Sequence, residues 1–464
     1  MKVLRRHRIV EVLITGILCL GSTAAFTLET SASVERTLIS HVNVFNGKDK
    51  KLLMDANVLV EGNLIKQVSV DEIAAPGAVV IDGGGRTLIP GLIDVHVHLA
   101  INSVFDETIQ ERPWMYTGVK AGVVANQMLM RGFTTVRDAG GPVAGLKQAI
   151  DEELVAGPRI YPSGPVLSQT GGHFDWEPSA QYISPYFTGI PPRTTLFGWA
   201  YLADGVPEVQ KAAREIFRTG ATQIKIATGA GLASLWDPLH QWQYTPEEVA
   251  AIVYEARRLD TYVMSHSFHS EGTRIAVEAG ARSIEHGYDT SDDVLREMRK
   301  KDVYLSTQFL LYTGVDPAEM GFPPDDPRRP NIDEALANFS DMFRRAKAIG
   351  VKMPFSTDLF GEPRIQAFQS REFSARANYF TPYEILVQAT SMGAELLSYS
   401  GRQNPYQAGP LGVIEEGAYA DLVLVDGNPL VDVSLLADPL NNLKLIVKDG
   451  KVYKNTLVDP SDTQ

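Results

Sequence analysis

The stretch 88–99, LIPGLIDVHVHL, constrains this chain most, because it places two histidines on one predicted strand. The turn pair Pro90-Gly91 precedes a short run rich in β-branched residues, and this pattern predicts a strand. Successive side chains of a strand alternate between its faces, so His96 and His98 share one face. Two neutral imidazoles on one face can bind a metal ion, and two buried, hydrogen-bonded histidines are the alternative.

The middle of the chain alternates predicted strands with predicted helices. After the strand at 91–98, further strands are predicted at 134–138, 159–162, 223–227, 262–266, 283–286, 303–306 and 353–358. One intervening helix, over 246–259, begins after a Thr245 cap, with Glu248 three residues later. Eight such units predict an α/β fold, a (β/α)₈ TIM barrel over residues 90–401. Two helix-poor insertions, 168–204 and 312–331, follow barrel strands, and we expect them to shape the mouth of a pocket.

Both ends of the chain have a different pattern, in which short strands alternate with turns. Such strands are predicted at 38–42, 56–60, 64–68, 419–425 and 444–453. No comparable pattern of short strands and turns without helices occurs between residues 90 and 401. We therefore expect residues 34–89 and 402–456 to form one small composite β-sandwich domain.

The first 25 residues have the layout of a secretory signal peptide. A basic head precedes the apolar run 9–20, and small residues follow at 22–25. The apolar run is short for a membrane span, and an uncleaved anchor is the alternative. The single cysteine, Cys19, lies in this segment, so a mature chain would have no disulfide. We expect cleavage of 1–25, a periplasmic or secreted protein, and no membrane partner after cleavage.

The net charge of −13 argues against a nucleic-acid partner. More specific information comes from the carboxyl ends of the predicted barrel strands, where active sites of such barrels lie. Five strands end in a side chain that can bind a metal, and these residues are His96 with His98, Lys225, His266, His286 and Asp358. Four of the nine histidines of the chain fall in this set, which is more than chance clustering explains.

This ordered set, the motif 90–98 and the split β domain resemble the amidohydrolase superfamily. Within it the chain is similar to the metal-dependent dipeptidase and carboxypeptidase branch. That neighbourhood includes Xaa-Pro dipeptidase-like, imidazolonepropionase-like and ochratoxin-hydrolysing proteins. The resemblance extends over about residues 36–455.

The resemblance implies a centre with two zinc ions per chain. Its implied ligands are His96, His98 and Asp358 for the more buried ion, and His266 and His286 for the second. Lys225 would be carboxylated by carbon dioxide, and the carbamate would bridge both ions. Manganese, cobalt and iron are alternatives for such nitrogen and oxygen ligands.

The reaction implied by the resemblance is hydrolysis of an amide bond by a metal-bridging hydroxide. Asp358 would take the proton of the water and pass it to the leaving nitrogen. The expected substrate is a dipeptide or N-acyl amino acid with a free C-terminal carboxylate. A lactonase or phosphotriesterase with the same centre is one alternative, and a non-catalytic protein that keeps the fold is another. Relatives often assemble, so we expect a homo-oligomer.

Candidate substrate-binding residues lie near these ligands. By resemblance, His173 contacts substrate from the loop that carries Gly171-Gly172, and a surface histidine is the alternative. Arg137 is a weaker candidate, since an ion pair between it and Asp138 is the structural alternative. Phe268 stands where relatives often carry a second strand-5 histidine, so we expect this wall to be more apolar. Asp94 is expected to support a ligand.

Other aromatic residues are expected to complete the apolar wall of the pocket. They are Trp176, Tyr182, Tyr186 and Phe187, with Trp114 and Tyr116 as weaker members. Together with a carboxylate-binding His173, this wall predicts a leaving amino acid with an apolar or aromatic side chain.

Overall fold

The structure is a computed structural model that describes residues 35–103, 108, 111–176, 188–232, 237–312, 315–338 and 340–457. All of them belong to one compact unit, Glu35–Gln464. The predicted signal peptide and the aromatic residues Tyr182, Tyr186 and Phe187 lie outside the described residues.

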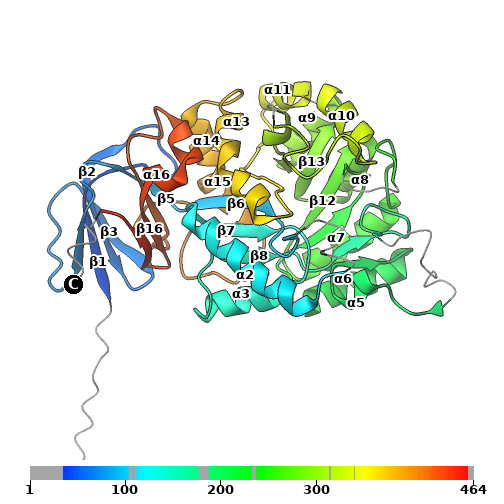
Figure 1. The fold of residues 1–464 in the computed structure, drawn as a ribbon, viewed down its shortest axis with the longest axis horizontal. Helices are drawn as coiled ribbons and strands as arrows, with labels where there is room; N and C mark the ends of the chain where they lie inside the picture. The colour runs from blue at the N-terminus through cyan, green and yellow to red at the C-terminus, as the bar shows by residue number, and fades with distance from the viewer. Residues whose placement is uncertain are drawn as a thin grey trace, which may run out of the picture. The chain divides into compact units, whose positions relative to one another are not determined.

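Strands from both ends of the chain form one eight-stranded sheet (Figure 1). Its strands are β1 (Arg36–Val44), β2 (Leu53–Glu61), β3 (Leu64–Ser69), β4 (Val79–Asp82), β5 (Thr87–Pro90), β15 (Leu422–Val425), β16 (Leu443–Lys448) and β17 (Lys451–Asn455). The strand order is β17-β16-β15-β5-β1-β2-β3, and β4 pairs with β1. The two chain ends join where β5 runs antiparallel to β15, with Ile89 opposite Val423.

Parallel strands make up the middle of the chain, in two sheets. One has the order β6 (Leu92–Val97), β7 (Phe133–Asp138), β8 (Arg159–Pro162). The other has the order β10 (Ala200–Leu202), β9 (Val166–Ser168), β11 (Ile224–Ala227), β12 (Val263–His269), β13 (Ser283–Asp289), β14 (Tyr304–Ser306). The short strands β9 and β10 were not predicted, and they come from the first insertion and the residues just before it.

Helices alternate with most of these strands up to β14, and a run of helices follows β14. They are α2 (Trp114–Met130), α3 (Ala144–Asp151), α5 (Arg193–Leu196), α6 (Val206–Arg218), α7 (Pro246–Arg258), α8 (Ser270–Ala279), α9 (Asp292–Lys301), α10 (Arg329–Asn338), α11 (Ser340–Ile349), α12 (Pro363–Gln366), α13 (Arg371–Arg376), α14 (Pro382–Gln388), α15 (Ser391–Ser398) and α16 (Pro439–Asn442). The capping box predicted for α7 is confirmed, because Thr245 and Glu248 bond each other's backbone N–H groups. Within the described ranges, no helix is long and apolar enough to cross a membrane.

The predicted strand at 353–358 does not form a regular ladder. Backbone hydrogen bonds nevertheless reach both neighbours: Val95 donates to Phe355, Asp358 to His96, and Leu305 to Lys352. Proline lacks an N–H group, so Pro354 interrupts the donor pattern that a strand ladder requires. The segment therefore lies between β6 and β14 without a strand's full pairing.

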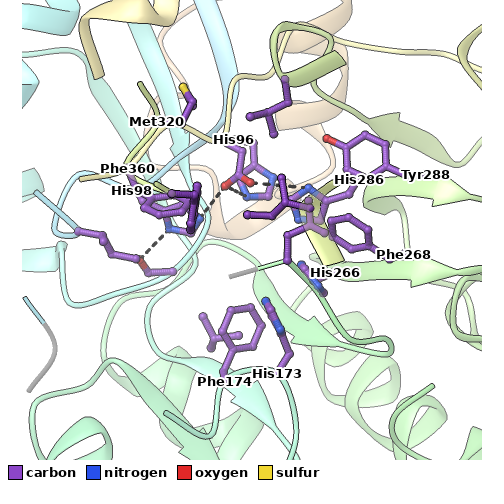
Figure 2. A pocket seen from close by; sticks show the side chains of 18 of the residues that line it. His96, His98, His173, Phe174, His266, Phe268, His286, Tyr288, Met320 and Phe360 are labelled. Carbon is purple, nitrogen blue, oxygen red and sulfur yellow. Dashed lines mark hydrogen bonds and ion pairs between the residues drawn. The ribbon is translucent and has the colours of Figure 1, made fainter. Parts of the chain in front are cut away.

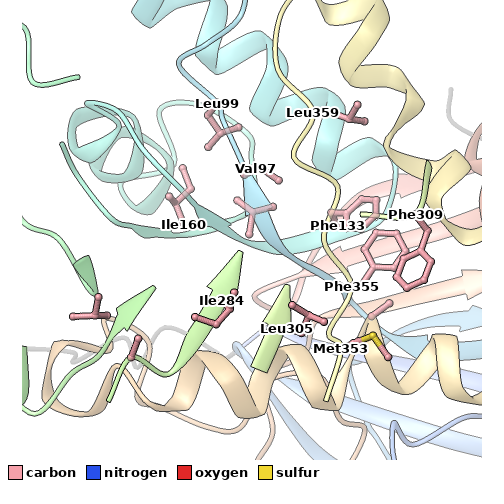
Figure 3. Packing of buried hydrophobic residues seen from close by; sticks show 14 of the residues in the cluster. Val97, Leu99, Phe133, Ile160, Ile284, Leu305, Phe309, Met353, Phe355 and Leu359 are labelled. Atoms are coloured by element: carbon pink, nitrogen blue, oxygen red, sulfur yellow. The ribbon is translucent and has the colours of Figure 1, made fainter. Parts of the chain in front are cut away.

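The apolar core holds the strands that carry the polar residues. Along β6 and the residue that follows it, the buried Val95 and Val97 alternate with His96 and His98, as the two-residue period of a strand requires. Phe133 of β7 packs against Phe355 with ring centroids 5.6 Å apart (Figure 3). This alternation directs one face of the strand into the core and leaves the other for the histidines.

Candidate active site

Two imidazoles and a carboxylate meet at one point beside β6 and β13. Ligand atoms of His96, His286 and Asp358 all lie within 4.8 Å of one another. The Nε2 atoms of His96 and His98 each lie 3.2 Å from Asp358 Oδ1 (Figure 2). These side chains form a candidate cation site.

Two residues of this site have a strained backbone. His286 has a φ of 72° and Asp358 a φ of 51°, in the left-handed region that favours glycine. Such a conformation costs about 1–3 kcal/mol per residue and persists where the surrounding structure imposes it. The folded protein holds both residues in place at the expense of local stability.

Lys225 and His266 complete the group of strand-end residues. Lys225 Nζ lies 3.5 Å from His96 Nε2, and the His266 and His286 ring centroids are 4.5 Å apart. All six residues that the sequence singled out at strand ends line one cavity. The tertiary structure therefore brings together residues from five segments of the chain.

Each of the four imidazoles directs one ring nitrogen to an oxygen outside the cluster. The pairs are His96 Nδ1 with Glu285 Oε2 at 2.6 Å, His98 Nδ1 with the Gly140 carbonyl at 3.5 Å, His266 Nε2 with the Ala230 carbonyl at 3.1 Å, and His286 Nδ1 with Gln308 Oε1 at 2.9 Å. An oxygen acceptor requires a proton on that nitrogen, so the other nitrogen of a neutral ring keeps its lone pair. This is the arrangement of metal-binding histidines, and the residues fit a metal centre.

Burial sets the charge of these groups. It lowers the pKa of His98, lowers that of His266 well below its usual range, and lowers that of His286 to about 3, so these rings are neutral at pH 7. Burial also lowers the pKa of Lys225 to about 8. For Asp358, burial raises the pKa, but His96 beside it outweighs this and holds the pKa well below its usual range.

Glu285 is a residue of the site that the sequence analysis missed. It is fully buried, accepts from His96, and accepts from both Arg137 Nη2 (2.9 and 3.0 Å) and Ser283. Burial would raise the pKa of Glu285, but Arg137 and His96 hold it well below its usual range. A carboxylate directly before His286 on a predicted buried strand was the available signal.

The structure corrects the assignment of Arg137 as a substrate contact. Arg137 is fully buried, is absent from the lining of the cavity, and donates to Val95 O, Glu285 and Tyr262. It also forms no ion pair with Asp138, the partner that the sequence suggested, because its guanidinium reaches Glu285 instead. Arg137 therefore holds Glu285 in place, and Glu285 in turn holds the His96 ring.

Two buried aspartates hydrogen-bond the backbone around the candidate cation site. Asp94 accepts from the His96 and Thr357 N–H groups and from the Thr357 hydroxyl, which agrees with its expected supporting place. Asp138 accepts from the Leu99 and Gly140 N–H groups, and burial raises its pKa to about 7. Both carboxylates hold the backbone at the ends of these strands and so fix the positions from which the histidine side chains extend.

The remaining predicted contacts, His173 and Phe268, both line the cavity (Figure 2). The Phe268 ring lies 5.2 Å from that of His286 and 4.9 Å from that of Tyr288, measured between centroids. Both insertions reach the cavity. The apolar side chains of its lining are Ile101, Val166, Phe174, Trp176, Leu232, Phe268, Leu311, Pro317, Met320, Phe322, Ile332, Leu336 and Phe360.

Two expected members of the apolar wall lie elsewhere. Trp114 and Tyr116 are 44% and 48% exposed and do not line the cavity. Trp114 lies at the start of α2 and packs against Phe197. Sequence alone could not place this helix start relative to the cavity mouth.

Known proteins are similar to this chain in sequence and in fold. The chain is 29% identical to ochratoxinase of Aspergillus niger over 387 residues, 80% of this chain and 77% of that protein. A solved prolidase complexed with N-methylphosphonate-L-proline superposes with a TM-score of 0.83, 34% identity, and coverage of 91% of this chain and 100% of that one. A solved Xaa-Pro dipeptidase with bound methionine superposes with a TM-score of 0.78 and 29% identity, and covers 91% of this chain and 100% of that one.

A match to a protein family covers most of the chain. Residues 87–454, from β5 to β17, match the Amidohydrolase family. This span includes every strand and loop that carries a cavity residue. The chain belongs to the amidohydrolase family and is a hydrolase that acts on carbon–nitrogen bonds.

Proposed function

We propose that this chain is a binuclear metal-dependent hydrolase. It would cleave an amide bond of a dipeptide or N-acyl amino acid whose C-terminal carboxylate is free. The observation that carries this proposal is the set of four imidazoles, each with one nitrogen bonded to an outside oxygen, gathered around Asp358 and Lys225.

The scaffold that we propose for this centre is a closed (β/α)₈ barrel over residues 90–401. Support comes from the backbone bonds that place the segment 353–358 between β6 and β14. On the other side, Thr222 before β11 donates to Pro162 of β8. These contacts bridge the two parallel sheets at both of their junctions.

His96, His98 and Asp358 would hold one zinc ion, and His266 and His286 the other. Lys225 would be carboxylated and join the two sites. Because burial lowers its pKa to about 8, its amine is partly neutral near neutral pH and can attack carbon dioxide, forming an N–C bond and releasing one proton. When bound, two such ions polarise a carbonyl and lower the pKa of water towards about 7.

Asp358 would move the proton of the reaction. Its carboxylate is ionised at neutral pH, and its oxygens lie among the histidines at the cavity wall. It can accept a proton from the attacking water and deliver it to the leaving nitrogen, so that the amine leaves neutral. Arg137 and Glu285 would keep His96 in position throughout.

His173 would bind the substrate carboxylate. Lys225 is the only lysine or arginine among the described residues that line the cavity. The stretches 104–107, 109–110, 177–187, 233–236 and 313–314 contain no lysine or arginine in sequence. His173 is therefore the side chain left for an anion, and the apolar lining suits an aromatic or aliphatic group beside it.

A substrate panel tests the proposal. Purified protein with measured metal content would be offered N-acyl amino acids and dipeptides, a lactone series and a phosphotriester series. We expect about two zinc ions per chain and hydrolysis of the amides at the highest kcat/KM. A preference for lactones or phosphotriesters would contradict the proposed bond specificity, and metal-loaded protein inactive on all three would contradict hydrolysis.

We further propose export and assembly. The basic head, apolar run and small residues of 1–25 support cleavage and a periplasmic or secreted location. Sequencing the N-terminus of protein from its native host would contradict this if residue 1 or 2 were the start. Light scattering of the purified protein tests the expected homo-oligomer.

A further inference from the structure

We propose that Asp237 is a positioning residue that holds the His173 ring in the orientation needed to bind substrate. The inference rests on the proposed function, in which His173 binds the substrate carboxylate. Sequence analysis did not single out Asp237, which lies 64 residues from His173 in the chain.

Hydrogen bonds fix one edge of the His173 ring. Its Nδ1 lies 3.0 Å from Asp237 Oδ2, and its backbone N–H donates to Gln243 Oε1 at 3.0 Å. Gln243 Nε2 also reaches Asp237 Oδ2 at 3.3 Å, so the three residues form one network. Only 5% of His173 and 2% of Asp237 are exposed.

Packing fixes one face and the far edge of the ring. The His173 ring stacks on the His266 ring at a centroid distance of 4.0 Å and an interplanar angle of 12°. A Cβ at Gly231 would lie 2.4 Å from His173 Cε1, so a glycine is required where the chain passes this edge. The ring is therefore confined between a proposed metal ligand and the backbone of Gly231.

The network determines which atom faces a ligand. Asp237 accepts from Nδ1–H, and no described residue hydrogen-bonds to Nε2, the remaining nitrogen of a residue that lines the cavity. The imidazole would lie between the Asp237 carboxylate and that of the substrate. In the described part of the chain Asp237 Oδ1 has no hydrogen-bond partner, and burying such an oxygen costs free energy.

The alternative, that Asp237 only stabilises the fold, makes a different prediction for catalysis. Loss of a purely structural carboxylate lowers stability and leaves the KM of the folded enzyme unchanged. Loss of a positioning group raises KM for the acid substrate while kcat, which depends on the metal centre, stays within about threefold.

A double-mutant cycle separates these cases. D237A and H173A should each raise the KM for an N-acyl-phenylalanine about tenfold or more, because a hydrogen bond to a charged group is lost. In the H173A background, D237A should have no further effect on KM. D237N keeps an oxygen acceptor and should recover most of the loss. An equal KM increase in both backgrounds, or no recovery with D237N, would overturn the inference.

Two measurements that do not depend on turnover complete the test. Metal content should stay the same in all variants, and calorimetry should show weaker binding of L-phenylalanine to D237A than to the wild type. The control is D421A, which removes another buried aspartate, one that pairs with Arg159 outside the cavity. D421A should lower the unfolding temperature and leave KM unchanged.

Failure of the proposed function has a separate signature. If wild-type protein with full metal content cleaves no acyl amino acid, the proposed function fails. The unfolding temperatures of the four proteins in the cycle then still report whether residues 173 and 237 interact. If wild-type protein cleaves the substrate and D237A leaves both its KM and the affinity for L-phenylalanine unchanged, only the inference about Asp237 fails.

Discussion

His96 Nδ1 lies 2.6 Å from Glu285 Oε2, and Arg137 Nη2 donates to both oxygens of the same carboxylate, at 2.9 and 3.0 Å. His96, Glu285 and Arg137 are each fully buried. Arg137 compensates the charge of Glu285, and Glu285 in turn fixes the proton of His96 on Nδ1. The other ring nitrogen of His96, Nε2, lies 3.2 Å from Asp358 Oδ1.

Removing this carboxylate should weaken metal binding rather than abolish folding. We expect Glu285→Gln to reduce metal affinity about 10–100-fold, because an outer partner of a ligand histidine contributes about that much. Competition with a chromophoric chelator measures the affinity. Glu372→Gln is the matched control, since Glu372 is equally buried but bonds Arg376 and the backbone of Phe309 and Leu310. Equal affinity in wild type and Glu285→Gln would contradict this role.

Lys225→Ala should lose at least one metal and nearly all activity, because no other described lysine lines the cavity. Retention of two metals at wild-type affinity would show that Lys225 does not bridge them. Mass spectrometry of the intact wild-type chain should show the mass of one added carbon dioxide.

The pH dependence of carboxylation follows from the lowered pKa of Lys225. The neutral amine reacts, and its fraction rises with pH and reaches one half at the pKa of about 8. At constant dissolved carbon dioxide, metal-free protein should therefore be carboxylated faster at pH 8 than at pH 6.5. An equal rate at both values would mean that the Lys225 amine is neutral throughout this range.

Asp358→Asn should separate metal binding from proton transfer. The amide keeps an oxygen that can bind weakly but has no basic group at neutral pH. We expect kcat to fall about 10²–10⁴-fold, the usual contribution of general acid–base catalysis, while part of the metal remains. A decrease below about tenfold with both metals retained would assign the proton to another group.

Gly231→Ala should displace the His173–His266 stack, since the added Cβ would lie 2.4 Å from His173 Cε1 and 2.6 Å from His266 Nε2. We expect a large loss of kcat/KM with a folded protein by circular dichroism. Gly145→Ala in α3 is the control, because its Cβ would meet no atom within 4 Å. This control should keep activity and gain about 0.4–1 kcal/mol of stability.

Masking the substrate carboxylate should lower kcat/KM about ten- to a hundredfold, because a hydrogen bond to a charged group contributes about 1.5–3 kcal/mol. The measurement compares an N-acyl-phenylalanine with its C-terminal amide and with the lysine and proline counterparts. Equal rates for acid and amide would contradict carboxylate binding by His173. A strong preference for lysine or proline would contradict the apolar pocket.

Sequence by itself determined the position of every strand-end residue that lines the cavity. His96 and His98 fall on one face because a strand has a period of two, and Lys225, His266 and His286 each lie within a short β-rich run. The family's parallel architecture then places these ends together. Local pattern and chain order suffice for such residues, since backbone geometry alone determines where they lie.

Only the tertiary structure decided which side chains pair. Arg137 could have paired with its neighbour Asp138, yet it reaches Glu285, 148 residues away, and His173 reaches Asp237, 64 residues away. It also placed Trp114 and Tyr116 away from the cavity and left 353–358 without a regular ladder. A long side chain selects its partner by distance, direction and desolvation in the folded protein, and none of these is encoded in the local sequence pattern.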